Sequence, residues 1–211
     1  MVGPSSSHTA GAVRLGQIAR AILGSQPVEA LIELHGSFAQ TGKGHGTDRG
    51  IVAGLLGMAT DDPDLRHSFE IATQVGLAFR FQAVDLGEDE HPNTARVTLS
   101  DGTRQVQVKG ASIGGGLVEI TAVDGYQVSF GCEYDTLLVV ADDQPGTVNA
   151  VTGWMLKHGI NIAFLRVERQ KRGGRAIMII ETDQPADEEI LEAFEDFHWV
   201  YWVRQVSKVE V

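Results

Sequence analysis

Cysteine is almost absent from this sequence. Cys132 is the one cysteine among 211 residues, so the chain cannot form an internal disulfide, which fits a reducing compartment. A single thiolate also cannot hold an iron–sulfur cluster, because such clusters take several thiolate ligands. The seven histidines show no metal-site spacing such as His-x-x-x-His, and the sequence shows no carboxylate–histidine cluster. We therefore expect no metal site in this chain, and metal chemistry would need a partner chain.

Basic residues are also scarce. The chain has 17 Lys and Arg against 28 Asp and Glu, a net charge of −11, which argues against nucleic acid and anionic membranes because both bind clustered cations. No apolar run approaches the roughly 18–20 residues that span a bilayer. The N-terminus lacks the charged start and apolar core of a signal peptide. We expect a soluble, cytoplasmic protein with room for one large or two modest domains.

The C-terminal third has the clearest pattern of secondary structure. An apolar run typical of a buried strand is followed by the breakers Pro145 and Gly146, and Gly159 is placed to end a helix. The expected elements are a strand at 137–140, a helix at 148–155, strands at 161–168 and 176–180 joined by a glycine turn, a helix that begins near 187, and a strand at 199–206. This order is the βαββαβ pattern of ferredoxin-like domains, which we assign to residues 135–208.

Helix and strand signals are mixed in the first 130 residues, where we place an α/β domain at 1–131. The expected elements are a helix around 15–22, a strand at 28–34, a glycine-rich loop at 42–46, helices at 48–58 and about 68–79, and β-rich runs joined by Asp101-Gly102 and Asp124-Gly125. Asp-Gly pairs between strands are a strong hairpin signal. The three glycines at 114–116 interrupt one strand, which suggests a bulge or a close backbone approach.

A serine-rich motif stands where the first helix is expected to begin. Its residues are Gly3, Pro4, Ser5, Ser6, Ser7, His8 and Thr9. Hydroxyls and free backbone N–H groups at a helix N-terminus form a natural site for a carboxylate or phosphate, and His8 adds a proton donor or a positive charge. The alternative is a helix cap with a solvated lead-in. The residues alone favour neither.

A second candidate anion site lies in the glycine-rich segment at 42–49. Its candidate residues are Lys43, His45, Thr47, Asp48 and Arg49. The segment is not a P-loop, because the glycine spacing is one residue too long and glycine follows Lys43 where Ser or Thr would bind magnesium. A loop with cations and free amides still suits a small anion. We favour that interpretation over a plain turn in which Asp48 caps the next helix.

A third candidate site lies in the C-terminal domain. Asp143, Pro145 and Gly146 stand where its first strand meets its first helix, and Asn161-Ile162 begin its second strand. Amides at such a turn can bind the carboxylate of an amino acid, and we expect Asn161 to face the Pro145-Gly146 turn. The alternative is a turn that binds nothing.

Together these segments resemble the iron–sulfur-dependent L-serine dehydratases, specifically the β chain of the two-chain form. The motif at 3–9, Gly44-His45-Gly46-Thr47-Asp48 and Ser112-Ile113-Gly114-Gly115-Gly116 are similar to that family's signatures. The C-terminal domain resembles an ACT domain through Asp143-x-Pro145-Gly146 and Gly159-Ile160-Asn161-Ile162. The resemblance implies an α+β fold, in which an N-terminal α/β domain similar to the allosteric substrate-binding domain of D-3-phosphoglycerate dehydrogenase precedes a ferredoxin-like ACT domain. Members of the family usually carry a further strand and turn before the serine motif.

The resemblance also implies an activity. An L-serine ammonia-lyase converts L-serine to pyruvate and ammonia with a [4Fe-4S] cluster that acts as a Lewis acid. Because this chain has one cysteine, the cluster would be held by an α subunit, without which this chain would be inactive. The residues expected to act in catalysis are Ser5, Ser6, Ser7, His8 and Thr9, and those expected to bind substrate are Lys43, His45, Thr47, Asp48 and Arg49. Asp143, Pro145, Gly146, Asn161 and Ile162 would bind an amino-acid effector, L-serine or another. We also expect a homodimer through the ACT domain, paired along 199–203.

Other interpretations remain open. The chain would be a non-catalytic, amino-acid-sensing regulatory subunit if no α partner exists for it. A related two-domain arrangement occurs at the C-terminus of some D-3-phosphoglycerate dehydrogenases, so a regulatory fragment of that enzyme is a further candidate. A purely structural subunit would leave the anion sites empty.

Overall fold

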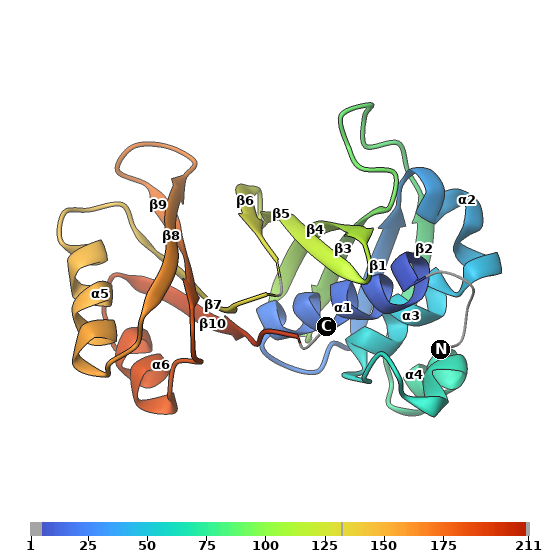
Figure 1. The fold of residues 1–211 in the computed structure, drawn as a ribbon, viewed down its shortest axis with the longest axis horizontal. Coiled ribbons are helices and arrows are strands. Elements are labelled where there is room, and N and C mark those ends of the chain that lie inside the picture. Colours follow the sequence, from blue (N-terminus) through green and yellow to red (C-terminus); the bar gives the residue numbers. More distant parts are fainter. Residues whose placement is uncertain (1–5, 132, 210–211) are drawn as a thin grey trace. The chain divides into compact units, whose positions relative to one another are not determined.

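The computed structural model describes residues 6–131 and 133–209, so that Ser5 and Cys132 lie outside the described residues. This part of the chain forms two compact units, shown in Figure 1; the first ends at Gly125 and the second begins at Tyr126. No helix within these residues is long and apolar enough to cross a membrane.

The first unit combines four helices with a mixed sheet. Its helices are α1 (Ser6–Leu23), α2 (Gly36–His45), α3 (Thr47–Leu55) and α4 (Ser68–Gln74), with the short 3-10 helix η1 (Pro63–His67) before α4. Its strands are β1 (Glu29–Leu34), β2 (Ala78–Ala83), β3 (Thr94–Ser100), β4 (Gln105–Gly114) and β5 (Leu117–Val123). The sheet order is β2-β1-β3-β4-β5-β6, and at β6 (Tyr126–Phe130) the chain passes into the second unit. β1 pairs with β2 in parallel and with β3 antiparallel.

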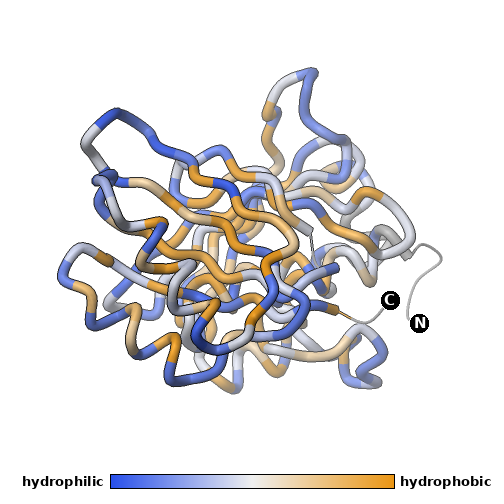
Figure 2. The backbone as a smooth tube through the Cα atoms, turned by 60° about the vertical axis from the view of Figure 1, so that its left-hand side comes forward, coloured by the Kyte–Doolittle hydropathy of each residue, from blue (hydrophilic) through white to orange (hydrophobic). Residues whose placement is uncertain are grey.

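Helix α1 packs along α3 and against β3, β4 and β5. The helix predicted around 15–22 is confirmed, and four apolar residues whose spacing puts them on one face of it are all buried: Leu15, Ile18, Ala19 and Ile22. Figure 2 shows hydrophobic residues concentrated within strands and helices and hydrophilic residues at the outer turns. The two predicted hairpins are also confirmed, because Asp101-Gly102 joins β3 to β4 and Asp124-Gly125 joins β5 to β6.

The second unit confirms the βαββαβ order. After β6 it contains β7 (Asp135–Asp142), α5 (Thr147–Lys157), β8 (Ile162–Arg169), β9 (Arg175–Thr182), α6 (Glu188–Glu195) and β10 (Val200–Val206). The sheet order is β10-β7-β9-β8 with every pair antiparallel, so β8 and β10 are its edges. Gly159, with φ 68°, follows the last turn of α5 as predicted. The Asp187 side chain caps α6 by accepting a hydrogen bond from the Ile190 N–H at 3.0 Å, a capping geometry typical of Asp.

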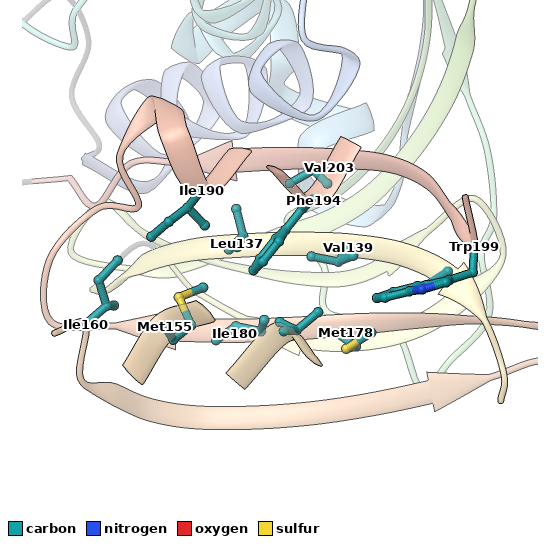
Figure 3. Packing of buried hydrophobic residues seen from close by; sticks show 12 residues of the cluster. Leu137, Val139, Met155, Ile160, Met178, Ile180, Ile190, Phe194, Trp199 and Val203 are labelled. Carbon is teal, nitrogen blue, oxygen red and sulfur yellow. The ribbon is translucent and has the colours of Figure 1, made fainter. Parts of the chain in front are cut away.

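The core of the second unit lies between its sheet and its two helices. Figure 3 shows Met155 of α5 and Phe194 of α6 pointing onto Leu137, Val139 and Met178 of the sheet. Each of these five side chains is buried, and burying a large apolar side chain stabilises the fold by about 1.5–3 kcal/mol. β6 contacts β8 and β9, and residues 135–141 of the central strand β7 are all buried.

The segment at 42–46 is not the loop that its glycines predicted. α2 continues to His45, and the break comes only at Gly46, whose φ of 79° is left-handed. Glycine in a helix interior costs about 1 kcal/mol relative to alanine. The helix persists because Phe38, in its first turn, is fully buried and fixes α2 to the core. Tertiary packing thus overrides local propensity here.

Two further predictions about element boundaries were wrong. The helix expected to reach Phe79 ends at Gln74, and Gly76 then takes a left-handed φ of 80°, a common helix stop. Phe79 instead belongs to the edge strand β2. The three glycines at 114–116 do not interrupt a strand but turn the chain from β4 into β5, with φ of 60° at Gly115 and 82° at Gly116; two successive positive φ angles are typical of a type I′ hairpin turn. The suggested irregularity is present beside this turn, because the register of the β4–β5 pairing shifts between Ser112 and Gly114.

Candidate functional site

The starts of α1 and α3 lie side by side. A Cβ placed on Gly50, the fourth residue of α3, would lie 3.1 Å from the carbonyl oxygen of Thr9, the fourth residue of α1. About two turns beyond Thr9 in α1, a Cβ on Gly16 would lie 2.3 Å from the carbonyl oxygen of Ile51 in α3. The two helices therefore run in the same direction in backbone contact, and Figure 1 shows them next to each other. The first turns of the two helices, with the partial positive charge of each helix N-terminus, meet at one place, which favours an anion.

His8 belongs to this helix start. Its Nε2 atom lies 3.2 Å from the Ser37 hydroxyl of α2, and its ring meets the Phe38 ring edge-on, with centroids 5.5 Å apart. Ser6 and Ser7 form the first turn of α1 before it, and Ser5 lies outside the described residues. Thr9 is buried. The described part of the serine motif, residues 6–9, thus forms the first turn of α1, and the His8 imidazole contacts α2.

Thr47 begins α3 and is fully buried. Its hydroxyl has no hydrogen-bond partner within the described residues, and Gly46, which precedes the helix, offers no side-chain cap. The Asp48 carboxylate accepts a hydrogen bond from the Arg49 N–H at 2.8 Å. A buried, unpaired hydroxyl costs about 1–3 kcal/mol, so Thr47 is a donor for which the described chain supplies no acceptor.

The third motif lies along the same end of α1. Ser112 is fully buried, and a Cβ on Gly11 would lie 2.0 Å from its hydroxyl oxygen. The Ser112 N–H donates to the Asn93 carbonyl at 3.0 Å. In the glycine turn that follows, the Gly116 carbonyl accepts a hydrogen bond from the Arg14 guanidinium of α1 at 2.6 Å. Residues more than 100 positions apart therefore meet at the first turns of α1.

The other candidates of the second motif lie differently. Arg49 is turned toward α4, where its guanidinium lies over the Phe69 ring at 4.6 Å and within 3.5 Å of the Glu70 carboxylate. Its cation is therefore engaged on the side of α4. Lys43 and His45 belong to the last part of α2. Of the five residues expected to bind substrate, Thr47, Asp48 and Arg49 lie in the first turn of α3, and the Arg49 side chain is the one that turns toward α4.

In the ACT unit, Asp143 is held at the tip of the β8–β9 hairpin. Its carboxylate accepts a hydrogen bond from the Gly173 N–H at 2.9 Å and pairs with Arg169 at 3.1 Å. These two contacts, the backbone N–H above all, hold the pKa of Asp143 below its ordinary value. Pro145 follows in the turn, and Gly146, with φ 97°, immediately precedes α5.

The expectation that Asn161 faces this turn is wrong within one chain. The turn precedes α5 and Asn161 follows it, so the two are separated by the length of an eleven-residue helix, about 16 Å. The Asn161 amide donates instead to Asp183 at 2.6 Å, and Ile162 pairs with Thr182 at that end of the sheet. Figure 3 shows the two ends, with Ile160 at one and Trp199 at the other; the Trp199 carbonyl accepts from Asp142 beside the turn.

Some residues of the site carry no signal in the sequence. Ser37 and Phe38 contact His8. Asn93 makes two hydrogen bonds with the backbone of Ser112: its carbonyl accepts from the Ser112 N–H, and its side-chain amide donates to the Ser112 carbonyl at 3.4 Å. These residues stand outside every motif, and only their contacts across the fold identify them. Among the described residues, no group of three or more His, Cys, Asp or Glu is placed to hold a metal ion.

Comparison with known proteins gives two family matches. A family model described as serine dehydratase beta chain matches residues 1–81, and a model described as ACT domain matches residues 136–198. The second match agrees with the fold of the second unit.

Three relatives show how far the similarity extends. The chain is 41% identical over 192 residues to the probable L-serine dehydratase β chain of Bacillus subtilis, across 91% of this chain and 87% of that protein. It is 38% identical over 194 residues to the L-serine dehydratase β chain of Peptoniphilus asaccharolyticus, across 92% and 87%. It is 32% identical over 109 residues to D-3-phosphoglycerate dehydrogenase of Methanocaldococcus jannaschii, across 52% of this chain but only 21% of that protein.

Proposed function

The chain belongs to the family of L-serine dehydratase β chains, and we propose that, together with an α chain, it converts L-serine to pyruvate and ammonia. The observation that carries the proposal is the meeting of three motifs, distant in sequence, at the adjoining starts of α1 and α3. The rival interpretation, a fragment of D-3-phosphoglycerate dehydrogenase, is less favoured, because that similarity spans about half of this chain.

The chemistry of the site suits this substrate. L-serine loses a proton from Cα and hydroxide from Cβ; the resulting enamine becomes an imine, which water hydrolyses to pyruvate and ammonia. Two helix N-termini side by side favour the substrate carboxylate. The Thr47 hydroxyl would gain there the acceptor that it lacks in the described chain. A hydrogen bond to a charged group contributes about 1.5–3 kcal/mol.

His8 gives the site a group that can carry a proton near neutral pH. His8 is the third residue of α1, after Ser6 and Ser7, so it stands at the same end of the helix as the anion site. The serine hydroxyls and His8 would therefore contact the substrate, and Asp48, in the first turn of α3, would line the same site.

The family's iron–sulfur cluster does not fit the residues of this chain. The described residues offer no group of metal ligands, and the sequence has a single cysteine. We therefore assign the cluster to the α chain and derive no step through it here. The β chain supplies the hydroxyls, the imidazole and the helix starts that complete a shared active site.

The test is anaerobic co-purification with candidate cluster-bearing partners, followed by an assay of pyruvate formed from L-serine. We expect a complex that turns over serine, and no iron absorbance or turnover from this chain alone, even after cluster reconstitution. Stoichiometric iron and turnover from the single chain would overturn the division between the two subunits. A stable complex without turnover would favour the regulatory subunit.

The ACT unit would regulate the enzyme as a homodimer. Its edge strand β8 exposes Phe164, Leu165 and Val167, with 46%, 36% and 43% of each residue exposed. The strand first expected to pair is less suitable, because Trp199 and Val203 are buried in the core of the same unit. Unpaired, apolar edge strands are ready to pair with another strand. We therefore place the two-fold interface at β8.

Charge supports an antiparallel pairing of two β8 strands. The end of β8 leads into a basic turn, with Arg169, Lys171 and Arg172, whereas the start of β8 lies beside Asp183. A two-fold axis through the middle of β8 brings the basic end of one chain to the acidic end of the other, and opposite charges across an interface fix its register.

The same axis would complete the effector site. In one chain Asn161 and the Pro145-Gly146 turn stand at opposite ends of α5. Across the proposed axis, Asn161 of one protomer approaches the hairpin end of its partner, where Asp143 binds Arg169. Asp143, Pro145 and Gly146 would then meet the Asn161-Ile162 segment of the second copy, with an amino acid between them.

A further inference from the structure

We infer that Ser37 positions the His8 imidazole, and that its hydroxyl keeps a hydrogen bond to His8 Nε2 whether or not that nitrogen carries a proton. The inference rests on the proposed function, in which His8 contacts the substrate. It adds a positioning residue that lies outside all of the motifs. The distance of 3.2 Å between the Ser37 hydroxyl oxygen and His8 Nε2 is its starting point.

Ser37 is itself held firmly. The preceding Gly36 has a φ of 54°, and a Cβ there would lie 2.7 Å from the carbonyl oxygen of Pro92. The Phe38 N–H donates to the same Pro92 carbonyl at 3.3 Å, and the Thr41 hydroxyl donates to the Ser37 carbonyl at 2.7 Å. Because these contacts fix the backbone on both sides of Ser37, its hydroxyl stays in place and can restrain the position of the His8 ring.

The ring is held by two adjacent residues of α2. Phe38 is fully buried and meets the ring edge-on at an interplanar angle of 62°, while Ser37 binds the ring nitrogen farthest from the backbone. The aromatic contact restricts the plane of the imidazole. The hydroxyl then distinguishes the two orientations of the ring within that plane, because a ring flip would replace Nε2 by carbon.

A hydroxyl suits a histidine that gains and loses a proton. It accepts a hydrogen bond when Nε2 carries hydrogen, and it donates one when Nε2 is bare, simply by rotating its own hydrogen. A backbone carbonyl or a carboxylate could do only the first. Ser37 therefore keeps the imidazole in place through a proton transfer without favouring one state strongly.

The first test measures the ring directly in the full chain. Imidazole ¹⁵N shifts are recorded for the wild type, Ser37→Ala and Ser37→Thr, at a pH where histidine is neutral, with His8→Gln used only to assign the signals. We expect Ser37→Ala to change the proportion of the two neutral tautomers of His8, and Ser37→Thr, which keeps the hydroxyl, to restore it. Unchanged His8 shifts in Ser37→Ala would overturn the inference.

The second test uses the complex with the α chain. Loss of one neutral hydrogen bond predicts a fall in kcat of roughly two- to tenfold in Ser37→Ala, with little change in KM for L-serine and with recovery in Ser37→Thr. An equal fall in both variants that follows their melting temperatures would show a structural role and overturn the inference. If the wild-type complex does not turn over serine, the proposed function fails, while the ¹⁵N shifts still decide whether Ser37 positions His8.

Discussion

Replacing Gly16 by alanine tests the contact on which the whole site depends. In an isolated helix this change would stabilise by about 1 kcal/mol, because glycine is the poorer helix former. In α1 the new Cβ would lie 2.3 Å from the carbonyl oxygen of Ile51 and 2.9 Å from the Gly54 Cα and the Leu55 nitrogen. All three neighbours are backbone atoms, so none can swing aside. α1 and α3 must separate to admit the methyl group.

The expected outcome is a net loss of stability in the first unit. Overpacking of this kind costs about 1–3 kcal/mol, and the backbone contacts place Gly16→Ala at or above the upper end of that range. Subtracting the gain in helix propensity leaves roughly 2 kcal/mol of destabilisation. For a unit of this size, that lowers the melting temperature by about 8 °C. Because the separation also displaces the start of α1 from that of α3, turnover of the complex should fall.

A matched control is Gly153→Ala in α5, where a Cβ would have nothing within 4 Å, so this variant should gain stability. The two units can be followed separately, because the three tryptophans, 154, 199 and 202, all lie in the second unit. Gly16→Ala should shift the circular dichroism transition and leave tryptophan fluorescence nearly unchanged, whereas Gly153→Ala should shift the fluorescence. If Gly16→Ala stabilised the chain as the control does, the two helix starts could not be as close as the site requires.

Three other changes test the remaining assignments. Thr47→Val should leave the melting temperature unchanged or raise it, since the hydroxyl has no partner in the described chain, but should raise KM for L-serine about tenfold or more; a lower melting temperature would reveal an internal partner. Leu165→Lys should convert a dimer into a monomer of 22.7 kDa in sedimentation at tens of micromolar, while Val75→Lys, at an exposed site of the first unit, should leave the dimer intact; a dimeric Leu165→Lys chain would rule out the β8 interface. His8→Ala should depress turnover at saturating serine by roughly one to two decades, while Asn161→Ala should flatten only the response to an amino-acid effector; the reverse pattern would show that catalysis and regulation had been assigned to the wrong units.

The ACT unit could be predicted well because its signals are local. Pro145 and Gly146 end a strand, Gly159 ends a helix and Asp187 begins one, and each acts within a few residues of its own position. The helix limits in the first unit were harder to predict. α2 runs through glycines because Phe38 is buried. β2 begins within the segment whose spacing predicts a helix, because Phe79 packs on Phe69 of α4. These outcomes depend on partners distant in the chain.

The sequence by itself determined the motifs, the βαββαβ order, and the need for a partner to hold any cluster, since one cysteine cannot supply the ligands whatever the fold. Only the tertiary structure decided which residues meet. The glycines at 11, 16 and 50 bring α1 against β4 and α3, and these contacts place the serine motif, Thr47 and Ser112 together. Ser37 became visible only beside His8. The physical reason is that capping and turn signals act over a few bonds, whereas backbone contact between two helices depends on what lies opposite each glycine, which no single stretch of sequence contains.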